Sequence, residues 1–227
     1  MTASFYQIRE CENPACGLRY PLTEGHPFGE RCPLCLGATR VELQKSLDQE
    51  IFSGREAGPT PGAASAQAET QRLEALLDNV RSAWNVGAIF RTADAFGVSR
   101  LHLCGVTPTP ENVSVSKTAL GADKTIPWLA ARNGLAAARE LKAAGAWLLA
   151  LEQDERAVAA GDFLMDTRLE AERIVLIVGN EISGVDPGLL DLCDRILYIP
   201  MRGRKRSLNV EVAFGIAAQL LSTNLRS

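Results

Sequence analysis

The sequence predicts an α/β protein with a mainly parallel β-sheet, preceded by a small cysteine-rich module. Two short apolar runs, Ile174–Val178 and Ile196–Ile199, are rich in β-branched residues and end at polar or turn residues. Such runs are typical of strands that are buried on both faces of a sheet. Segments with helical spacing alternate with these and other strand-like runs, which favours a parallel sheet covered by helices. The third observation is a group of four cysteines near the N-terminus, which indicates a separately stapled unit.

Composition sets broad limits on the function. The chain of 227 residues carries a net charge of −3, so its overall charge does not attract nucleic acid, and only a local basic cluster would do so. No apolar run is long enough to cross a bilayer, and the first residues lack the layout of a signal peptide. We therefore expect a cytoplasmic protein.

Residues 1–45 are predicted to form a zinc-ribbon-like module. The cysteines pair as C-x4-C and C-x2-C, with fifteen residues between the pairs. Four thiolates suit a tetrahedral Zn²⁺, and so short a segment has too few apolar residues to fold without a staple. In the second pair Pro33 starts a turn, and Gly37 lets backbone N–H groups approach the sulfurs. The predicted metal ligands are Cys11, Cys16, Cys32 and Cys35.

Other interpretations of these cysteines are weaker. Two disulfides are disfavoured in a cytosolic chain, and a redox C-x2-C should open a helix after a strand, whereas this one lies between turns. His26 could replace one cysteine, although a loop histidine is the simpler interpretation. A site closed by four cysteines has no open position, so its zinc is expected to be structural. The module is expected to bind nucleic acid or protein, and four arginines are available to phosphates: Arg9, Arg19, Arg31 and Arg40.

The main domain is predicted to follow a flexible linker. Residues 46–70 are rich in Gly, Pro, Ala and Ser, which indicates the linker. The domain, residues 71–227, begins with a strand over Leu73–Leu77. A helix runs from Asn85, a plausible N-cap, to Gly97, because apolar residues recur there at helical spacing.

Arg91 projects from this helix on a face that it shares with small residues. Ala88 and Ala95 lie on the same face and would let another chain or a ligand come close. The next elements are predicted as a strand over Leu101–Val106, a long connection over residues 107–127, a helix over Leu135–Ala144 and a strand over Trp147–Leu151. The long connection contains Lys117 and is a candidate substrate loop.

The functional site is predicted to lie after the two buried strands. In an open α/β sheet, ligands bind beyond the carboxyl ends of the strands. The chain changes to small and polar residues over Gly179–Glu181 and again over Pro200–Asn209, next to the start of the closing helix at Leu208. The second loop also carries a basic cluster, either a solvated face or a phosphate contact, and its position favours the latter: Arg202, Arg204, Lys205 and Arg206.

Three blocks of the main domain resemble the motifs of one family in order and spacing. They are Asn85-x-Gly87-x3-Arg91 with Phe96-Gly97, then Val178-Gly179-Asn180-Glu181-x2-Gly184 with Ile199-Pro200-Met201, then Ser207-Leu208-Asn209-Val210-x2-Ala213. Ser116–Ala122 resembles the segment between the first two motifs. The family is the SpoU/TrmH-type RNA 2′-O-methyltransferases of the SPOUT superfamily, and the resemblance covers roughly residues 72–225.

The resemblance implies an α/β fold with a C-terminal trefoil knot, an obligate homodimer, and S-adenosylmethionine bound in the knot. It implies cofactor contacts at Leu151, Gly179, Ile199 and Leu208. It assigns catalysis to Arg91, with Asn85, Glu181, Ser207 and Asn209 holding the site and substrate. The substrate-binding candidates are Lys117 and the basic cluster of Arg202, Arg204, Lys205 and Arg206. No G-x-G-x-x-G follows an early strand, so a Rossmann-type methyltransferase is disfavoured.

The predicted function is S-adenosylmethionine-dependent methylation of a ribose 2′-hydroxyl in tRNA or rRNA. The alternative is a non-catalytic RNA-binding or assembly factor on the same fold. Arginine normally stays protonated, so stabilising the developing alkoxide is an easier role for Arg91 than acting as a base, and both stay open. Three motif residues also have plain structural interpretations. Asn85 could only cap a helix, Glu181 could cap the short helix near Asp186, and Asn209 could only start the last helix.

Overall fold

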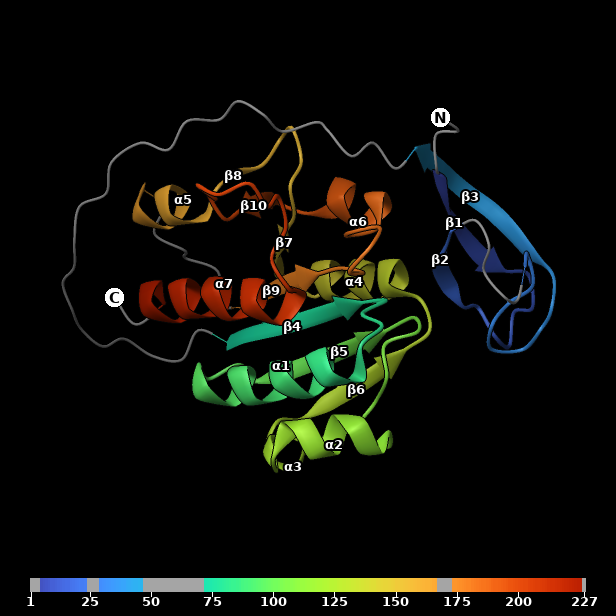
Figure 1. Cartoon of the computed structure of the whole chain (residues 1–227), viewed down its shortest axis with the longest axis horizontal. Coiled ribbons are helices and arrows are strands. Elements are labelled where there is room, and N and C mark those ends of the chain that lie inside the picture. The colour runs from blue at the N-terminus through green and yellow to red at the C-terminus, as the bar shows by residue number, and fades with distance from the viewer. Residues whose placement is uncertain (1–4, 24–28, 47–71, 167–172, 226–227) are drawn as a thin grey trace.

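The computed structural model describes residues 5–23, 29–46, 72–166 and 173–225, which form two sheets (Figure 1). The smaller sheet is antiparallel, in the order β2-β1-β3, with β1 at Phe5–Cys11, β2 at Arg19–Thr23 and β3 at Thr39–Ser46. The larger sheet has seven strands in the order β6-β5-β4-β9-β7-β10-β8, and every pairing in it is parallel. Its strands are β4 (Arg72–Asp78), β5 (Arg100–Cys104), β6 (Trp128–Ala131), β7 (Trp147–Leu151), β8 (Val158–Ala159), β9 (Arg173–Val178) and β10 (Arg195–Tyr198). The predicted α/β class with a mainly parallel sheet is confirmed.

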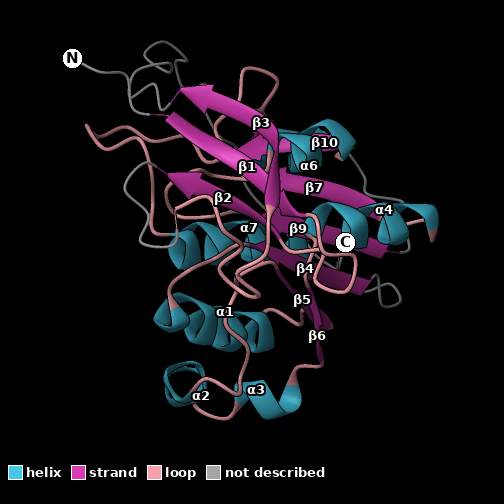
Figure 2. Cartoon of the chain, turned by 90° about the vertical axis from the view of Figure 1, so that its right-hand side faces the viewer, coloured by secondary structure: helices cyan, strands magenta, loops and turns pink. Residues whose placement is uncertain are grey.

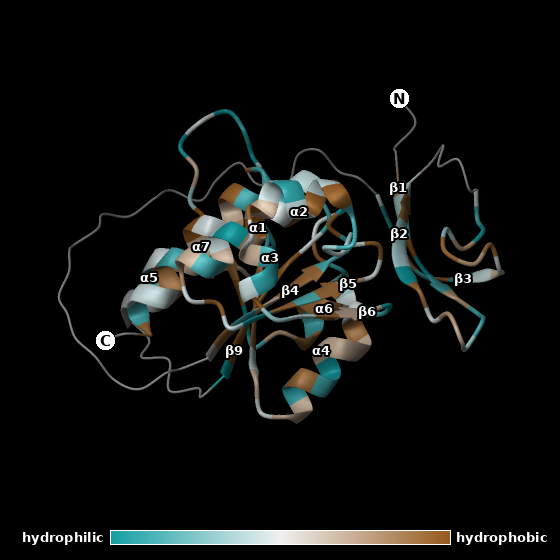
Figure 3. Cartoon of the chain, turned by 90° about the horizontal axis from the view of Figure 1, so that it is seen from below, coloured by the Kyte–Doolittle hydropathy of each residue, from teal (hydrophilic) through white to brown (hydrophobic). Residues whose placement is uncertain are grey.

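Helices cover both faces of the large sheet (Figure 3). One face carries α1 (Ala83–Ala95), α2 (Val113–Ala119), α3 (Ala122–Thr125), α5 (Ala160–Asp166) and α7 (Val210–Asn224). The other face carries α4 (Gly134–Ala143) and α6 (Pro187–Leu192). Successive residues of β9 pack into different cores, since Leu176 joins the first cluster and Ile177 the second. Burial on both faces explains why this strand is a continuous apolar run.

Most predicted elements of the main domain are confirmed with small shifts at their ends. The strand over Trp147–Leu151 matches β7, and the two buried runs match β9 and β10. The predicted helix over Leu135–Ala144 matches α4 within one residue at each end. The connection over residues 107–127 was predicted without helices, and this is wrong, because it contains α2 and α3. Only Val115 and Ala119 are buried in α2, so no wide apolar stripe marks that helix in the sequence.

The N-cap of α1 is Ser82 rather than the predicted Asn85. The Ser82 hydroxyl accepts a hydrogen bond from the Asn85 backbone N–H at 3.3 Å. The helix therefore begins before the motif residue, and the Asn85 side chain is available for other contacts.

The small sheet lies at the carboxyl ends of the large sheet's strands (Figure 1, Figure 2). Arg132, which follows β6, donates from Nη1 to the Cys16 carbonyl oxygen at 3.2 Å.

β3 continues to Ser46, one residue past the predicted module boundary. The predicted linker over 46–70, apart from Ser46, and the alternative ligand His26 lie outside the described residues. Among the described helices, none combines the length and apolar character needed to cross a membrane.

Candidate active site

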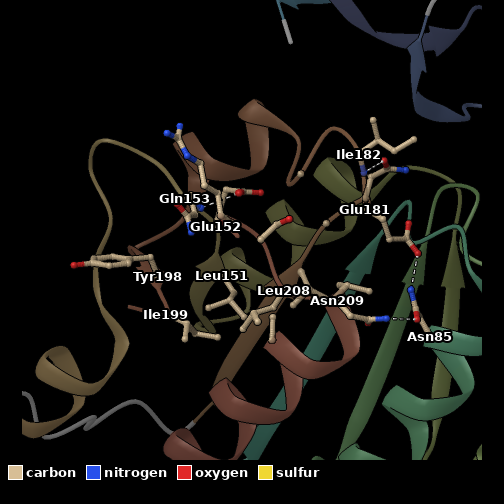
Figure 4. A pocket seen from close by; sticks show the side chains of 18 of the residues that line it. Asn85, Leu151, Glu152, Gln153, Glu181, Ile182, Tyr198, Ile199, Leu208 and Asn209 are labelled. Atoms are coloured by element: carbon tan, nitrogen blue, oxygen red, sulfur yellow. Dashed lines mark hydrogen bonds between the residues drawn. The ribbon is translucent and has the colours of Figure 1, made fainter. Parts of the chain in front are cut away.

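A pocket of about 660 Å³ lies beyond the carboxyl ends of β7, β9 and β10 (Figure 4). Its wall comes from the loops after these three strands, from the start of α7 and from Asn85 on α1. The motif residues among its lining are Asn85, Gly179, Glu181, Ile199, Ser207, Leu208 and Asn209. The tertiary structure thus brings all three motifs to one place, where the strand order predicted a ligand site.

Asn85, Glu181 and Asn209 form a hydrogen-bonded chain across one end of the pocket (Figure 4). Asn85 Nδ2 donates to Glu181 Oε1 at 3.0 Å, and Asn209 Nδ2 donates to Asn85 Oδ1 at 3.1 Å. Each residue comes from a different motif. The chain links helix α1, the loop after β9 and the start of α7 in a fixed arrangement.

Glu181 is held by backbone donors as well as by Asn85. Its carboxylate accepts the N–H groups of Arg81 at 2.9 Å and Ser82 at 3.0 Å. Burial acts to raise the pKa of Glu181, but these hydrogen bonds outweigh burial and hold the pKa below its ordinary value. The interpretation of Glu181 as a cap for α6 is wrong, because the Asp186 side chain caps that helix.

Asn209 serves both as a helix cap and as a member of this chain. Its Oδ1 accepts the Glu211 backbone N–H at 2.8 Å, which caps α7, while its Nδ2 reaches Asn85. The structural interpretation of Asn209 is therefore correct but incomplete. The interpretation of Asn85 as only a cap is wrong.

The middle of the pocket is apolar. Leu151 at the end of β7, Ile199 after β10 and Leu208 before α7 gather there (Figure 4). Gly179 lines the same region, but its missing side chain serves the loop itself. A Cβ at this position would lie 2.3 Å from the backbone of Gly184 and Val185. A glycine is therefore required here by the close approach of its own loop.

Glu152 is a pocket residue that the sequence analysis missed. Its Oε2 accepts the Val185 N–H and its Oε1 the Gln153 N–H, at 2.9 and 2.8 Å. Burial raises the pKa of Glu152, and these two backbone hydrogen bonds partly offset it. The available signal was a polar pair directly after the apolar strand β7. Gln153 extends the contact outward by donating to the Arg206 carbonyl oxygen at 2.7 Å.

The basic cluster lies at the rim of the pocket. All four of its side chains are exposed, and Arg206 lines the pocket itself. Lys117 is exposed on α2, and the pocket lining does not include it. The cluster is therefore placed to meet a ligand that extends out of the pocket, whereas Lys117 is not part of its wall.

Arg91 is exposed on α1 and does not line the pocket of its own chain. Arg91 is the sixth residue after Asn85, which places the two about 9 Å apart along the helix axis and roughly 120° apart around it. The side chain of Arg91 makes no hydrogen bond or ion pair with any other described residue. The structure therefore separates the predicted catalytic arginine from the residues that it was expected to join.

The model of the SpoU rRNA Methylase family matches residues 72–219. The chain belongs to the SpoU methylase family. The match covers all seven strands of the large sheet and stops within α7, five residues before that helix ends at Asn224, and the fold is of the SPOUT type. The small sheet lies outside the matched residues.

Curated relatives and solved structures agree with this assignment. The SpoU chain is 35% identical over 141 residues to the 23S rRNA (guanosine-2'-O-)-methyltransferase RlmB of Nitrosomonas europaea, covering 62% of this chain and 52% of that protein. An S-adenosylmethionine-bound rRNA methyltransferase from Sinorhizobium meliloti matches with a TM-score of 0.64 and 30% identity, covering 70% of this chain and 59% of that one. The TrmH/SpoU tRNA modifying enzyme of A. aeolicus matches with a TM-score of 0.59 and 28% identity, over 69% and 76% of the two chains. The chain thus spans about half the length of its first curated relative.

The four N-terminal cysteines of the SpoU chain converge on one point. Their sulfurs all lie within 4.8 Å of one another, and all four thiols are free. The Sγ atoms of Cys11 and Cys35 are 3.4 Å apart, and those of Cys16 and Cys32 are 3.7 Å apart. Sulfurs bound 2.3 Å from one tetrahedral zinc ion would be about 3.8 Å apart. The donor set and spacing therefore fit zinc, and the disulfide alternative does not match the structure.

Gly37 packs against this cysteine cluster as predicted. A Cβ on Gly37 would lie 3.3 Å from Cys35 Sγ, a tight contact that favours a glycine there. The backbone N–H of Gly37 holds the pKa of the Cys35 thiol down to about 7.

The expectation that four arginines of this module are available to phosphates is wrong for two of them. Arg9 and Arg19 are only 4% and 7% exposed, because each is enclosed by hydrogen-bond partners.

Proposed function

We propose that this SpoU protein transfers a methyl group from S-adenosylmethionine to a ribose 2′-hydroxyl of tRNA or rRNA. The observation that carries the proposal is the hydrogen-bonded chain of Asn85, Glu181 and Asn209 beside an apolar pocket. One curated relative is named for rRNA and one solved neighbour for tRNA, so the proposal keeps both classes of RNA.

The pocket fits S-adenosylmethionine in size and in chemistry. A volume of about 660 Å³ suits a ligand of this size. Leu151, Ile199 and Leu208 offer an apolar surface for the adenine, and the carboxyl groups of Glu152 and Glu181 suit a ligand with a positive sulfonium. The structural neighbour from Sinorhizobium meliloti is described as bound to this cofactor, which supports the assignment. When bound, the cofactor supplies an electrophilic methyl group.

The chain's residues must then orient the ribose and accept charge. Methyl transfer would break the bond from sulfur to methyl carbon, leave the sulfur as a neutral thioether, and form a bond from the ribose oxygen to that carbon. The hydroxyl proton would pass to water or to a base. Asn85 and Asn209 are held by Glu181 and by the α7 cap, so they can fix the ribose in line with the methyl group. A guanidinium beside the hydroxyl would stabilise its developing negative charge, and we assign this role to Arg91.

Arg91 reaches the chemistry in a homodimer, acting in the pocket of the second copy. Arg91 follows Trp84 by seven residues, so both lie on one face of α1. Trp84 is 64% exposed, and Val212 and Ile216 on the adjoining α7 are 44% and 37% exposed. Such neighbouring apolar side chains on two packed helices mark a surface that a second copy covers.

Zinc and the basic cluster complete the proposed assembly. The cysteine cluster holds a structural Zn²⁺, with no position left for catalysis. The basic cluster at the pocket rim binds RNA phosphates, because guanidinium groups donate well to phosphate oxygens. A protein that modifies tRNA or rRNA meets these substrates in the cytoplasm, and we propose that location.

The first test is the Arg91→Ala variant. We expect it to bind S-adenosylmethionine like the wild type and to lose at least about 100-fold in methyl transfer, as for other charge-stabilising groups. The measurement uses calorimetry with S-adenosylmethionine and mapping of 2′-O-methyl sites in total RNA from cells lacking the gene. The control is Arg139→Ala, an exposed arginine on α4 across the sheet, which should be unaffected. Unaltered turnover in Arg91→Ala contradicts the assigned role, and a wild type that binds no S-adenosylmethionine favours the non-catalytic alternative.

Mixed dimers test whether Arg91 acts on the second copy. Arg91→Ala and Asn209→Ala variants, each inactive alone, are unfolded together and refolded. If Arg91 acts across the dimer, random pairing makes roughly a quarter of all active sites intact. Half of the dimers are then mixed, and one of the two sites in each mixed dimer has both Arg91 and Asn209. If Arg91 acts within its own chain, no intact site forms and activity stays absent.

A further inference from the structure

The small sheet is joined to the main domain by a buried ion pair. Arg19, the first residue of β2, donates from Nε and Nη2 to Asp186 Oδ2 and Oδ1 at 2.5 and 3.1 Å. The two side chains are only 8% and 4% exposed. Glu10 and Glu42 of the small sheet lie 3.6 and 3.8 Å from Arg19 Nη1, so the guanidinium is fixed from both sides. A paired, bidentate contact of this kind constrains geometry as well as charge.

Asp186 ends the loop that forms one wall of the pocket. The loop Gly179–Val185 follows β9, and Asn180 and Gly184 close it by exchanging backbone hydrogen bonds at 3.0 and 2.9 Å. Val185, the residue before Asp186, donates its N–H to the pocket residue Glu152 at 2.9 Å. Displacement of Asp186 would therefore pull on a backbone group that the pocket wall holds.

Other residues of the small sheet lie against the same region. Tyr6 is buried, and burial together with the charges of Asp186 and Glu152 raises its pKa to about 12. The positive charge of Lys45 acts on Glu152 and Asp154, so β3 also faces the end of β7. The small sheet thus covers the outside of the two loops whose inside lines the pocket.

A second set of contacts prevents the small sheet from turning about this ion pair. The Arg19 backbone N–H donates to the Arg132 carbonyl oxygen at 3.2 Å, and Arg132 Nη1 donates to the Cys16 carbonyl oxygen at 3.2 Å. Asn133 Nδ2 donates to Glu10 at 3.2 Å. Cys16 is one of the four clustered cysteines, so the metal site and the domain contact share one short segment.

We propose that Arg19 is a positioning residue, and that the cysteine module braces the Gly179–Val185 loop in its cofactor-binding shape through the pair Arg19–Asp186. The module acts on the pocket of its own chain rather than as a separate RNA-binding arm. This inference rests on the proposed function only in that the loop is taken to bind S-adenosylmethionine.

The test compares the full-length wild type with Arg19→Met. We expect faster hydrogen exchange at the backbone amides of residues 179–188 and a dissociation constant for S-adenosylmethionine raised about tenfold, which corresponds to 1.4 kcal/mol. At saturating cofactor, the turnover number should stay within about twofold of the wild type, because a positioning effect on binding appears in KM. The matched control is Arg40→Met on β3, whose guanidinium is about half exposed and pairs with Glu10.

The double variant Arg19→Met/Asp186→Asn separates a lost brace from an unpaired charge. A single substitution leaves the Asp186 carboxylate buried without its partner, which destabilises by itself. Fast exchange over residues 179–188 in both variants supports the inference. Wild-type exchange in the double variant overturns it, because the unpaired charge then accounts for the effect.

The hydrogen-exchange measurement also separates this inference from the proposed function. A wild type that binds no S-adenosylmethionine refutes the function, while the exchange over residues 179–188 still reports on the brace. Wild-type exchange there in Arg19→Met overturns the inference even if the melting temperature falls, since the role of Arg19 would then be only structural.

Discussion

The cysteine module and the basic loop after β10 both carry arginines, yet the structure uses them in opposite ways. In the module, Arg9 and Arg19 are buried among hydrogen-bond partners, and the more exposed Arg40 pairs with carboxylates. In the loop, the four basic side chains of residues 202–206 are exposed at the rim of the pocket. Among the described residues of these two regions, only the loop presents a concentrated positive surface, so we assign attraction of RNA to the loop and support of the pocket to the module.

The two regions also differ in what stabilises them. The large sheet buries an apolar cluster on each face, whereas the module's cluster has six residues, three of them cysteines: Cys11, Cys16, Leu18, Tyr20, Leu22 and Cys32. So small an apolar cluster does not offset the conformational entropy of a three-stranded sheet. The folding of the module should therefore depend on the proposed zinc, and that of the large sheet should not.

Among the predicted changes, loss of one cysteine ligand should have the largest effect, and it should unfold the module but not the large sheet. The Cys32→Ser variant removes a ligand that is fully buried. Structural zinc contributes about 10–16 kcal/mol in small zinc modules, so we expect the module to unfold and the zinc content to fall from about one ion per chain to none. Hydrogen exchange should become fast in β1, β2 and β3 and stay slow in β4 and β9.

The control for this variant is Cys193→Ser. Cys193 is a half-buried thiol that does not belong to the cysteine cluster, so zinc content should be unchanged. Protected amides in β1–β3 of Cys32→Ser would show that the module folds without metal, and the contrast between the two regions would be lost.

An intermediate effect on stability is expected at Asp78, where the cysteine module meets the large sheet. Asp78 is buried at the end of β4, and burial, then the charge of Asp186, raises its pKa to about 7. In the unfolded chain the group titrates near 4, so the folded state binds an extra proton between about pH 4 and pH 7. The free energy of unfolding should therefore fall as the pH rises through this window, by an amount on the order of 4 kcal/mol.

The Asp78→Asn variant should remove this dependence. The amide keeps an oxygen that can accept the Asn79 Nδ2 hydrogen bond, seen at 3.0 Å in the wild type. We expect the variant to be more stable than the wild type at pH 8 and equal to it near pH 4, as measured by urea denaturation. A wild-type stability that rises from pH 5 to pH 7 relative to the variant would contradict the assigned protonation.

The smallest expected effect concerns RNA binding. Replacing Arg202 and Arg204 by Gln should weaken RNA affinity and reduce the salt dependence, with a slope smaller by about 0.7–0.9 for each lost phosphate contact. The matched pair Arg31→Gln and Arg40→Gln in the module should leave affinity and slope unchanged. The measurement is fluorescence anisotropy with a labelled RNA over a series of salt concentrations. A larger loss in the module pair would reverse the assignment of the two regions.

Local patterns in the sequence were sufficient for much of the fold. The apolar runs over Ile174–Val178 and Ile196–Ile199 predicted β9 and β10 because strands buried on both faces need apolar side chains at every position. The two short helices in 107–127 were missed because α2 buries little surface. The cap of α1 was placed three residues late, since both Ser82 and Asn85 are good cap residues and only the backbone path distinguishes them.

The candidate site shows the same division. The motif spacing predicted that Asn85, Glu181 and Asn209 belong together, and the pocket joins them. Their individual hydrogen bonds could not be predicted, because each partner lies about a hundred residues away in the chain. Glu152 was missed for the same reason, since its partner Val185 is brought to it only by the loop after β9.

By itself, the sequence determined five strands of the large sheet, the grouping of four cysteines and the set of motif residues, because these depend on residue type and on spacing within short segments. Only the tertiary structure decided which arginines are available. Arg19 and Arg91 carry the same charge in the sequence, but the fold buries Arg19 against Asp186 and leaves Arg91 exposed on α1. The function of a charged side chain depends on which carboxylates and surfaces surround it, and the fold assembles those surroundings from distant parts of the chain.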